Sequence, residues 1–240
     1  MADRGTISDT DVLYDARFSE AETRAKDLVW RELTRYFQRY VDSELPVLDV
    51  ACDRGYFIRN IRANEKWATD VRDLSAYLPS DVHFVLADGL ALPEKLPLSY
   101  FGTIFMSNYL EHLPTSDAVV QQLRVAHQLL RDDGKLVILQ PNIRLVGDAY
   151  WDFIDHKTPL TEKSLREAAE IAGFRAHTEI TRFLPYTSKS AIPKNPILVR
   201  GYLSFRFAWR YFGKQSLYVG ERVPAKSRIA ETREDKESGS

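Results

Sequence analysis

Three aspartates follow one another at similar spacing in the first half of the chain, each at the end of a short apolar run. Asp49 lies in the first run, Asp70 directly follows the second, and Asp88 closely follows the third. A nucleotide-type cofactor in an open α/β sheet needs a carboxylate at such a strand end to accept its ribose hydroxyls. Singly, each acid is more often a loop residue or a helix cap. Three in succession predict a cofactor site.

The loop after the first run, Ala51-Cys52-Asp53-Arg54-Gly55, is the candidate place for close approach of backbone to a ligand. Small residues are favoured there, because the following backbone N–H groups must point at the ligand. Asp53 adds a carboxylate instead, although aspartate tolerates left-handed dihedral angles and the turn can form. A tight structural turn without a ligand is the alternative for this loop taken alone.

Two histidines are the candidate proton acceptors, because imidazole changes its charge near neutral pH. His112 either takes a proton or supports the cofactor loop, and His156 either contacts an acceptor or makes a structural hydrogen bond. Glu111 stands beside His112 and is placed to hold one of the two rings or to cap its own turn. Five dispersed histidines and one cysteine do not form a metal-binding pattern, so we expect no metal site.

Short β-like runs alternate with helical stretches, which predicts a parallel sheet with both faces covered by helices. The expected strands are 47–50, 67–69, 82–86, 103–106, 135–139, 174–183 and 214–223. Helices are expected within 15–40, from Tyr56 onward and over 116–130. We divide the chain into an N-terminal helical cap (1–44), a main domain (45–223) and a polar tail (224–240) expected to be disordered.

Composition sets further bounds. The 240 residues suit one large α/β domain, and a net charge of −1 gives no overall attraction to nucleic acid or acidic lipid. The single cysteine cannot form an internal disulfide, which favours a reducing cytoplasmic location. The longest apolar runs are too short to span a membrane.

The motifs together resemble the class I S-adenosylmethionine (SAM)-dependent methyltransferases. Residues 48–55 resemble their first motif, which usually has glycine where Ala51 and Asp53 stand. Leu110-Glu111-His112-Leu113 ends a segment similar to the fourth strand of ubiquinone-biosynthesis-like methyltransferases, which often have Asp at the position of Gly102. Residues 129–138, Pro141-Asn142, Asp155-His156, Thr161, Leu165 and Ala172-Gly173-Phe174 extend the resemblance to about residues 45 to 180.

This resemblance implies a Rossmann-like, seven-stranded, mostly parallel α/β sheet with helices on both faces and an antiparallel last strand. It implies SAM as cofactor and S-adenosylhomocysteine (SAH) as product. The cofactor-binding residues would be Asp49, Ala51, Cys52, Asp53, Gly55, Asp70, Val71, Asp88, Gly89 and Asn108, with Tyr14 and Arg17 reaching the SAM carboxylate. Asp88 would lie near the adenine amino group. Asp53 would either pair with the ammonium group or weaken SAM binding.

A dehydrogenase is the competing interpretation, but the Asp53 carboxylate would repel a pyrophosphate, whereas an acidic site suits a sulfonium cation. We therefore expect methyl transfer to a hydroxyl of a small, lipid-linked or nucleotide-linked metabolite, with nitrogen and carbon as alternative targets. His112 or His156 would then be the base. A SAM- or SAH-binding protein without turnover, acting as a partner or regulator, is the alternative that Ala51 and Asp53 favour. The sequence does not predict an oligomeric state.

A basic and aromatic insert, residues 185–213, interrupts the second half of the domain. No acidic residue occurs from Phe183 to Gly220. An expected apolar stripe at helical intervals comprises Leu198, Tyr202, Phe205, Trp209 and Phe212, flanked by Arg206, Arg210 and Lys214. Such helices cover a sheet, bind amphipathic or anionic ligands, or lie on a membrane. We expect a lid over the acceptor site, with peripheral contact of residues 198–214 at the inner membrane surface; single-stranded nucleic acid is the minor alternative.

Overall fold

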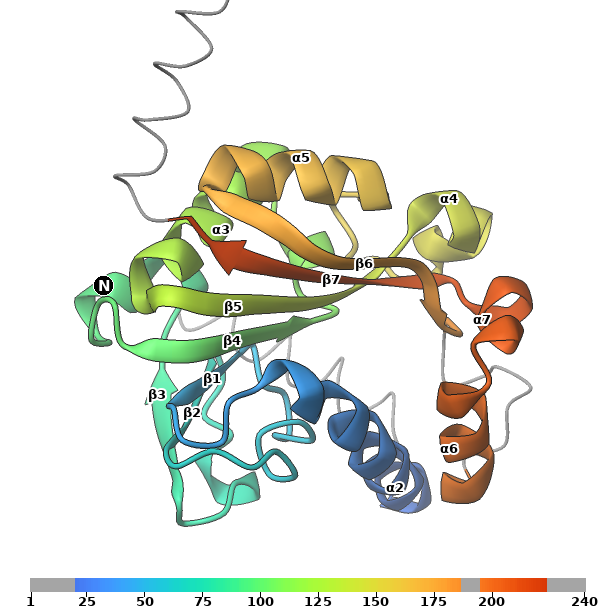
Figure 1. Ribbon diagram of the computed structural model, residues 1–240, viewed down its shortest axis with the longest axis horizontal. Coiled ribbons are helices and arrows are strands. Elements are labelled where there is room, and N and C mark those ends of the chain that lie inside the picture. Colours follow the sequence, from blue (N-terminus) through green and yellow to red (C-terminus); the bar gives the residue numbers. More distant parts are fainter. Residues whose placement is uncertain (1–19, 187–194, 224–240) are drawn as a thin grey trace, which may run out of the picture.

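The computed structural model describes residues 20–186 and 195–223. Seven strands form one sheet in the order β3-β2-β1-β4-β5-β7-β6 (Figure 1). They are β1 (Val47–Val50), β2 (Lys66–Asp70), β3 (Val82–Leu86), β4 (Phe101–Ser107), β5 (Leu130–Pro141), β6 (Phe174–Leu184) and β7 (Gln215–Arg222). The strands run parallel except β7, which pairs antiparallel with β5 and with β6. The expected mostly parallel sheet with an antiparallel last strand is confirmed.

The strand order reverses beside β1, because β2 and β3 extend the sheet on one side and β4 on the other. Every residue of β1 is buried, and so is β4 apart from its last residue, as apolar central strands of a parallel sheet require. Ligands of open α/β sheets bind outside the carboxyl ends of the strands at such a reversal. The topology therefore places the site at the ends of β1, β2 and β4.

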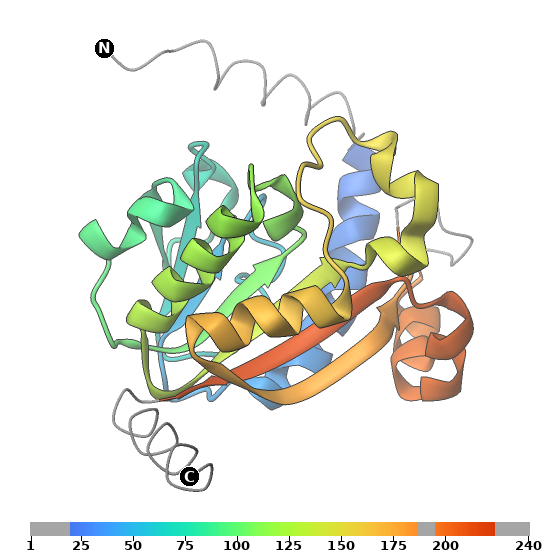
Figure 2. The ribbon, with the colours of Figure 1, turned by 90° about the horizontal axis from the view of Figure 1, so that it is seen from above.

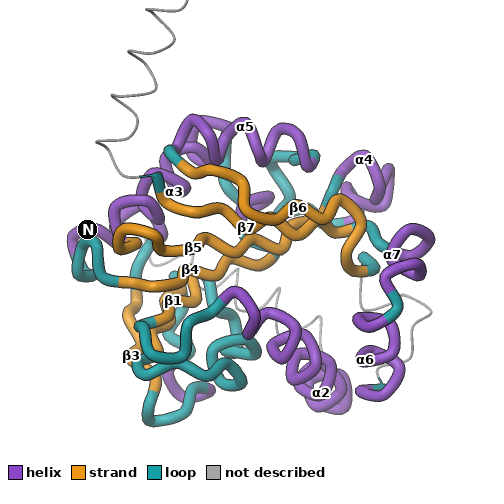
Figure 3. The backbone as a smooth tube through the Cα atoms, in the orientation of Figure 1, coloured by secondary structure: helices purple, strands orange, loops and turns teal. Residues whose placement is uncertain are grey.

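Helices cover both faces of the sheet (Figures 1 and 3). On one face lie α3 (Ser116–Leu129) and α5 (Glu162–Ala172), whose Leu123 and Leu165 belong to one buried cluster. On the other lie α2 (Glu20–Phe37), α6 (Pro196–Ser204) and α7 (Arg206–Phe212), whose Phe37 and Trp209 belong to a second cluster. The shorter helices are η1 (Gln38–Tyr40), η2 (Ser75–Tyr77), η3 (Gly89–Glu94), η4 (Leu110–His112), α4 (Ile143–Val146) and η5 (Gly147–Asp152).

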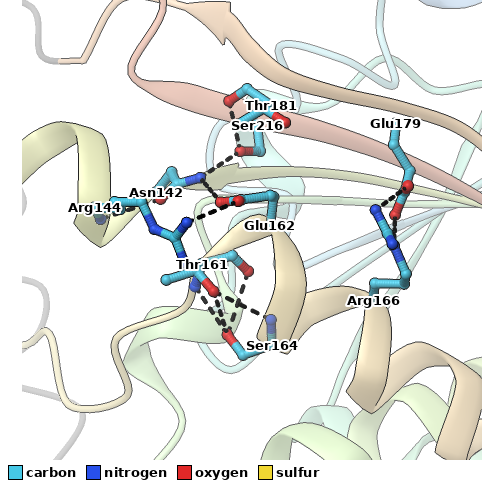
Figure 4. Close-up of polar contacts among 9 residues, drawn as sticks. All are labelled: Asn142, Arg144, Thr161, Glu162, Ser164, Arg166, Glu179, Thr181 and Ser216. Atoms are coloured by element: carbon cyan, nitrogen blue, oxygen red, sulfur yellow. Dashed lines mark hydrogen bonds and ion pairs between the residues drawn. The ribbon is translucent and has the colours of Figure 1, made fainter.

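A polar network fastens the end of β5 to its neighbours (Figure 4). The Asn142 side chain donates to Glu162 Oε2 at 2.7 Å and to Ser216 Oγ at 3.0 Å, and Ser216 donates to the carbonyl of Thr181 at 2.8 Å. The Asn142 N–H also donates to the carbonyl of Lys214 at 3.0 Å. Because α4 begins just after Asn142 and α7 ends just before Lys214, these two helices lie at the same end of the sheet (Figure 2).

Helix α5 confirms the expected start at Thr161 and exit at Gly173. The Thr161 hydroxyl accepts the N–H of Ser164 at 3.1 Å, and the Ser164 hydroxyl accepts the N–H of Thr161 at 2.9 Å, which forms a capping box. Gly173 ends the helix in a left-handed conformation with φ 102°.

The helix expected from Tyr56 is wrong. Residues 51–60 form turns, in which the N–H groups of Arg59 and Ile61 alone reach carbonyls four residues back. The four consecutive residues Gly55 to Ile58 are all buried, so this segment has no solvated helical face.

The single apolar stripe expected over 198–212 is also wrong, because the chain breaks into α6 and α7 at Phe205 (φ −100°, ψ 78°). Of the expected stripe, Trp209 is buried and its indole N–H donates to the Tyr202 carbonyl at 2.8 Å, whereas Leu198, Phe205 and Phe212 are exposed. Val199, outside the expected stripe, is also buried. Arg200 faces α2 and makes two hydrogen bonds to the buried Glu32 carboxylate, at 2.9 and 3.0 Å. This bidentate pair holds the pKa of Glu32 below its usual value. Within the described ranges, no helix is long and apolar enough to cross a membrane.

Candidate functional site

A cavity of about 650 Å³ opens at the carboxyl ends of β1, β2 and β4, where the strand order reverses. Its volume falls within the range of roughly 300–1,000 Å³ typical of small-molecule sites. One wall is the loop after β1 with the ends of β2 and β3. The opposite wall comes from η4, the segment around His156, the end of β6 and α6.

The loop after β1 alternates in handedness. Ala51, Asp53 and Gly55 have φ values of 55°, 49° and 70°, so all three positions that usually carry glycine are left-handed. The Cys52 N–H donates to the carbonyl of Thr69 at 2.9 Å, which ties the loop to β2. Gly55 has the left-handed conformation that favours glycine, and a Cβ there would lie 2.2 Å from the Leu78 side chain, which would have to move. The turn forms despite the two substitutions.

Asp53 is the centre of a charge network at the cavity wall. Its carboxylate lies 3.1 Å from Lys26 Nζ on α2 and 3.5 Å from the guanidinium of Arg72. Its backbone N–H donates to Asp70 Oδ2 at 3.1 Å. Asp53 therefore joins the N-terminal helix to the end of β2.

Two further aspartates lie buried in the same wall. Asp70 accepts the N–H of Arg72 at 3.0 Å and lies 3.4 Å from the Arg72 guanidinium. Burial raises the pKa of Asp70, and it raises the pKa of Asp49 well above its usual value, with the neighbouring carboxylates acting in the same direction. A ligand that is cationic or donates hydrogen bonds would lower these pKa values again, because it stabilises the ionised carboxylates.

The end of β3 contributes backbone rather than a carboxylate. Asp88 is exposed, and its side chain caps η3 by accepting the N–H of Leu90 at 2.8 Å. Gly89 lines the cavity, whereas Asp88 does not. A Cβ on Gly89 would lie 2.2 Å from Tyr109 Oη and 2.3 Å from Gln122 Oε1, two atoms that hydrogen-bond each other at 2.9 Å. Glycine is thus needed at this position for close packing.

The opposite wall carries both candidate histidines. His112 Nδ1 lies 3.1 Å from the carbonyl of Asp155 and 3.4 Å from its carboxylate, and His156 Nδ1 lies 2.8 Å from the carbonyl of Tyr150. Their ring centroids are 5.1 Å apart. Because a carbonyl only accepts, each Nδ1 is the donor in the neutral ring, and each Nε2 carries the lone pair.

Glu111 lies beneath this pair, fully buried, and accepts the side-chain N–H of Gln140 at 3.1 Å. Burial raises the pKa of its carboxyl group. Atoms of Glu111, His112 and His156 that could ligate a metal all lie within 4.8 Å of one another. The sequence placed Glu111 beside His112, but it did not indicate that His156 joins them.

The other predicted residues that face the cavity are Ala51, Cys52, Val71 and Asn108. Gly55 shapes the loop without lining the cavity. Tyr14 and Arg17 lie outside the described residues. Sequence reasoning missed Lys26 and Arg72: one is a lysine among many charges on α2, and the other follows Asp70 by two residues without any motif of its own.

A family profile described as a methyltransferase domain matches residues 21–179, well over half of the 240 residues. The chain belongs to this methyltransferase family. No curated protein matches the sequence of the methyltransferase significantly.

Several solved structures share its fold. A SAM-dependent methyltransferase from Archaeoglobus fulgidus has a TM-score of 0.60 and 18% identity, covering 82% of this chain and 94% of its own. A putative methyltransferase in complex with the Haloferax volcanii Trm112 methyltransferase activator has a TM-score of 0.62 and 15% identity, covering 85% and 94%. Geranyl diphosphate C-methyltransferase from Streptomyces coelicolor A3(2) has a TM-score of 0.56 and 10% identity, covering 80% and 77%.

At these identities the structures establish the fold alone. Family and fold together confirm the class I SAM-dependent methyltransferase predicted from the sequence. The ubiquinone-biosynthesis-like subgroup, the acceptor and the roles of individual residues stay predictions.

Proposed function

We propose that the methyltransferase transfers the methyl group of SAM to a hydroxyl of a small, lipid-linked or nucleotide-linked metabolite, with nitrogen and carbon as alternative target atoms. The observation that carries the proposal is the chemical contrast between the two walls of one cavity. Buried aspartates form the first wall, and two histidines with their tautomers set by backbone carbonyls form the second.

The first wall fits SAM. Asp70 stands where its carboxylate would accept the ribose hydroxyls, and Asp49 and Asp53 add negative charge toward a sulfonium and an ammonium group. The raised pKa values of Asp49 and Asp70 support this role, since the partners within the chain do not offset the cost of burying the two charged carboxylates. Lys26 and Arg72 are the cations nearest to this wall that would attract the SAM carboxylate. Contact of Tyr14 and Arg17 with the SAM carboxylate remains part of the proposal.

Bound SAM supplies an activated methyl group, so the chain must hold the acceptor in line and take up its proton. His112 Nε2 carries a lone pair, while Nδ1 is held by the carbonyl of Asp155. The Asp155 carboxylate, 3.4 Å from Nδ1, would stabilise the imidazolium formed after proton transfer. His156 is oriented in the same way by Tyr150 and would take either the proton or a hydrogen bond from the acceptor.

The rest of the acceptor wall is apolar and aromatic and is formed by Leu184, Tyr186, Val199 and Tyr202. This composition supports an amphipathic acceptor, and the cations of residues 198–214 support an anionic one. Peripheral contact of this segment with a membrane would then bring a lipid-linked acceptor to the cavity.

A SAM- or SAH-binding protein without turnover is the second candidate, which the residues Ala51 and Asp53 favour. Transfer of radiolabelled methyl groups from SAM into cell extracts separates the two. The proposal predicts incorporation that His112→Gln lowers about 10²- to 10⁴-fold while calorimetric SAM binding persists. Binding of SAM by the unaltered chain without incorporation into any extract would support the second candidate.

A further inference from the structure

An apolar patch covers the outer side of α6 and α7. Its members, which we call the α6–α7 patch, are Ile197, Leu198, Phe205, Phe207, Tyr211 and Phe212, and all are exposed. Phe207 contacts the rings of Phe205 and Tyr211, with centroids 5.9 and 5.2 Å away, so these three rings form one continuous group within the patch. Contiguous exposed apolar surface of this kind marks an interaction site.

Cations border the patch. Arg206, Arg210 and Lys214 are exposed, and none of them pairs with a carboxylate of the described residues. Arg200 of the same helix pair is different, because Glu32 of α2 neutralises it on the inner side. The outer side therefore presents aromatic rings beside cations that no acid of residues 20–186 or 195–223 pairs with.

A second apolar group lies at the same end of the sheet. Trp151 of η5 is 56% exposed and Ile154, shortly after it, is 86% exposed. The hydrogen bond from Asn142 to Lys214 joins the start of α4 to the end of α7, and Figure 2 shows both segments at this end. The segments that carry the two groups thus lie at the same end of the sheet.

The cavity reaches the segments that carry both groups. Its lining includes Val199 and Tyr202 of α6 together with Phe153 and His156. Phe153 also contacts the ring of Tyr186, with centroids 6.1 Å apart. The same segments therefore form the acceptor wall inside and the apolar surface outside.

We propose that this end of the methyltransferase docks on an anionic lipid bilayer, with the α6–α7 patch and the group at Trp151 and Ile154 inserted beside the cavity mouth. Aromatic rings bordered by arginine and lysine suit the interface between acyl chains and anionic headgroups. An acceptor with a lipid tail would enter the cavity directly from the bilayer. The delivery of acceptor rests on the proposed function, whereas the docking itself does not.

Cosedimentation of the full chain with vesicles tests the docking. We expect binding to vesicles of phosphatidylcholine mixed with phosphatidylglycerol, weaker binding to phosphatidylcholine alone, and a loss of affinity as salt is raised. Arg206→Gln with Arg210→Gln should weaken binding to the mixed vesicles about 25-fold, at roughly fivefold for each cation. The matched control is Arg124→Gln with Arg131→Gln, two exposed arginines on α3 and at the amino end of β5, which should leave binding unchanged.

The apolar contribution is tested in the same assay. Phe207→Ser and Ile154→Ser should each weaken binding roughly tenfold, because each removes a large side chain from the bilayer. Leu98→Ser, an exposed leucine before the amino end of β4, is the matched control and should have no effect. Equal loss with Leu98→Ser would overturn the assignment of the surface.

Absence of binding to both vesicle types would overturn the docking. Self-association that Phe207→Ser abolishes, in a chain that does not bind vesicles, would also overturn it, because a second copy would then cover the patch. Binding of an acidic protein without vesicle binding would overturn it too. SAM titration without vesicles keeps the two proposals separate. A chain that binds SAM but no vesicles refutes the docking alone, and a chain that binds vesicles but no SAM refutes the proposed function alone.

Discussion

Substitution of Asp53 by asparagine should reveal what this residue does in a loop position that usually holds glycine. Asparagine also tolerates the left-handed conformation at φ 49°, so the change removes charge and leaves the backbone intact. The lost contacts are the pairs with Lys26 at 3.1 Å and Arg72 at 3.5 Å. Partly exposed pairs of this kind contribute roughly 0.5–1 kcal/mol each.

The expected cost of Asp53→Asn is therefore about 1–2 kcal/mol, which corresponds to a fall in Tm of about 3–6 °C for a domain of this size. A double-mutant cycle with Lys26→Met in thermal unfolding should give a coupling energy of roughly 0.5–1 kcal/mol. Additive effects of the two substitutions would refute the pairing.

Ligand binding adds a second readout for the same variant. Without Asp53, the charges of Lys26 and Arg72 lose a common counter-ion at the cavity wall. Titration calorimetry should then show SAM weakened about tenfold, equivalent to about 1.4 kcal/mol, and SAH weakened less because SAH lacks the sulfonium charge. Tighter SAM binding by Asp53→Asn would refute this interpretation and identify Asp53 as a defect in the loop.

Three further predictions concern the two walls. Burial raises the pKa of Asp49 and Asp70, so both carboxyl groups keep their protons to a higher pH than an ordinary aspartate. Because SAM binds the ionised carboxylates, its affinity should rise as the pH rises from acid toward neutral. Calorimetry in buffers of different ionisation enthalpy should detect the protons released on binding. Gly89→Ala would break the Tyr109–Gln122 hydrogen bond, costing about 1–3 kcal/mol and lowering Tm by several degrees in scanning calorimetry. His112→Gln should reduce methyl transfer about 10²- to 10⁴-fold at unchanged SAM affinity, and equal loss of both would contradict a role as base.

Much of the fold could be predicted because its signals are local. Short apolar runs separated by helical connections specify a parallel sheet, and Thr161 and Gly173 specify the ends of α5 by their own hydrogen-bonding and conformational properties. The segment from Tyr56 could not be predicted as turns, because its burial depends on tertiary contacts such as those of Phe57 with Phe37 of α2 and Phe105 of β4. The break at Phe205 likewise depends on how Trp209 and Val199 reach the sheet.

The sequence predicts those site residues whose position follows from the end of a strand. Asp49 and Asp70 face the cavity because strand ends meet at one edge of the sheet, whatever the intervening loops do. Asp88 has a suitable position, but its side chain accepts the N–H of Leu90 and caps η3. Aspartate side chains readily bond to nearby backbone N–H groups in this way. The partners of Asp53 come from residues 26 and 72, and no periodic pattern connects residues so far apart in sequence.

Calorimetric titration with SAM, comparing the unaltered chain with Asp70→Asn, tests the central claim most directly. We expect saturable binding at one site, weakened roughly 10- to 100-fold by Asp70→Asn through loss of charged hydrogen bonds to the ribose. Asp81→Asn, which changes an exposed aspartate at the amino end of β3, is the matched control and should bind as the unaltered chain does. Absence of SAM binding at millimolar concentration, or equal binding by Asp70→Asn, would contradict the account.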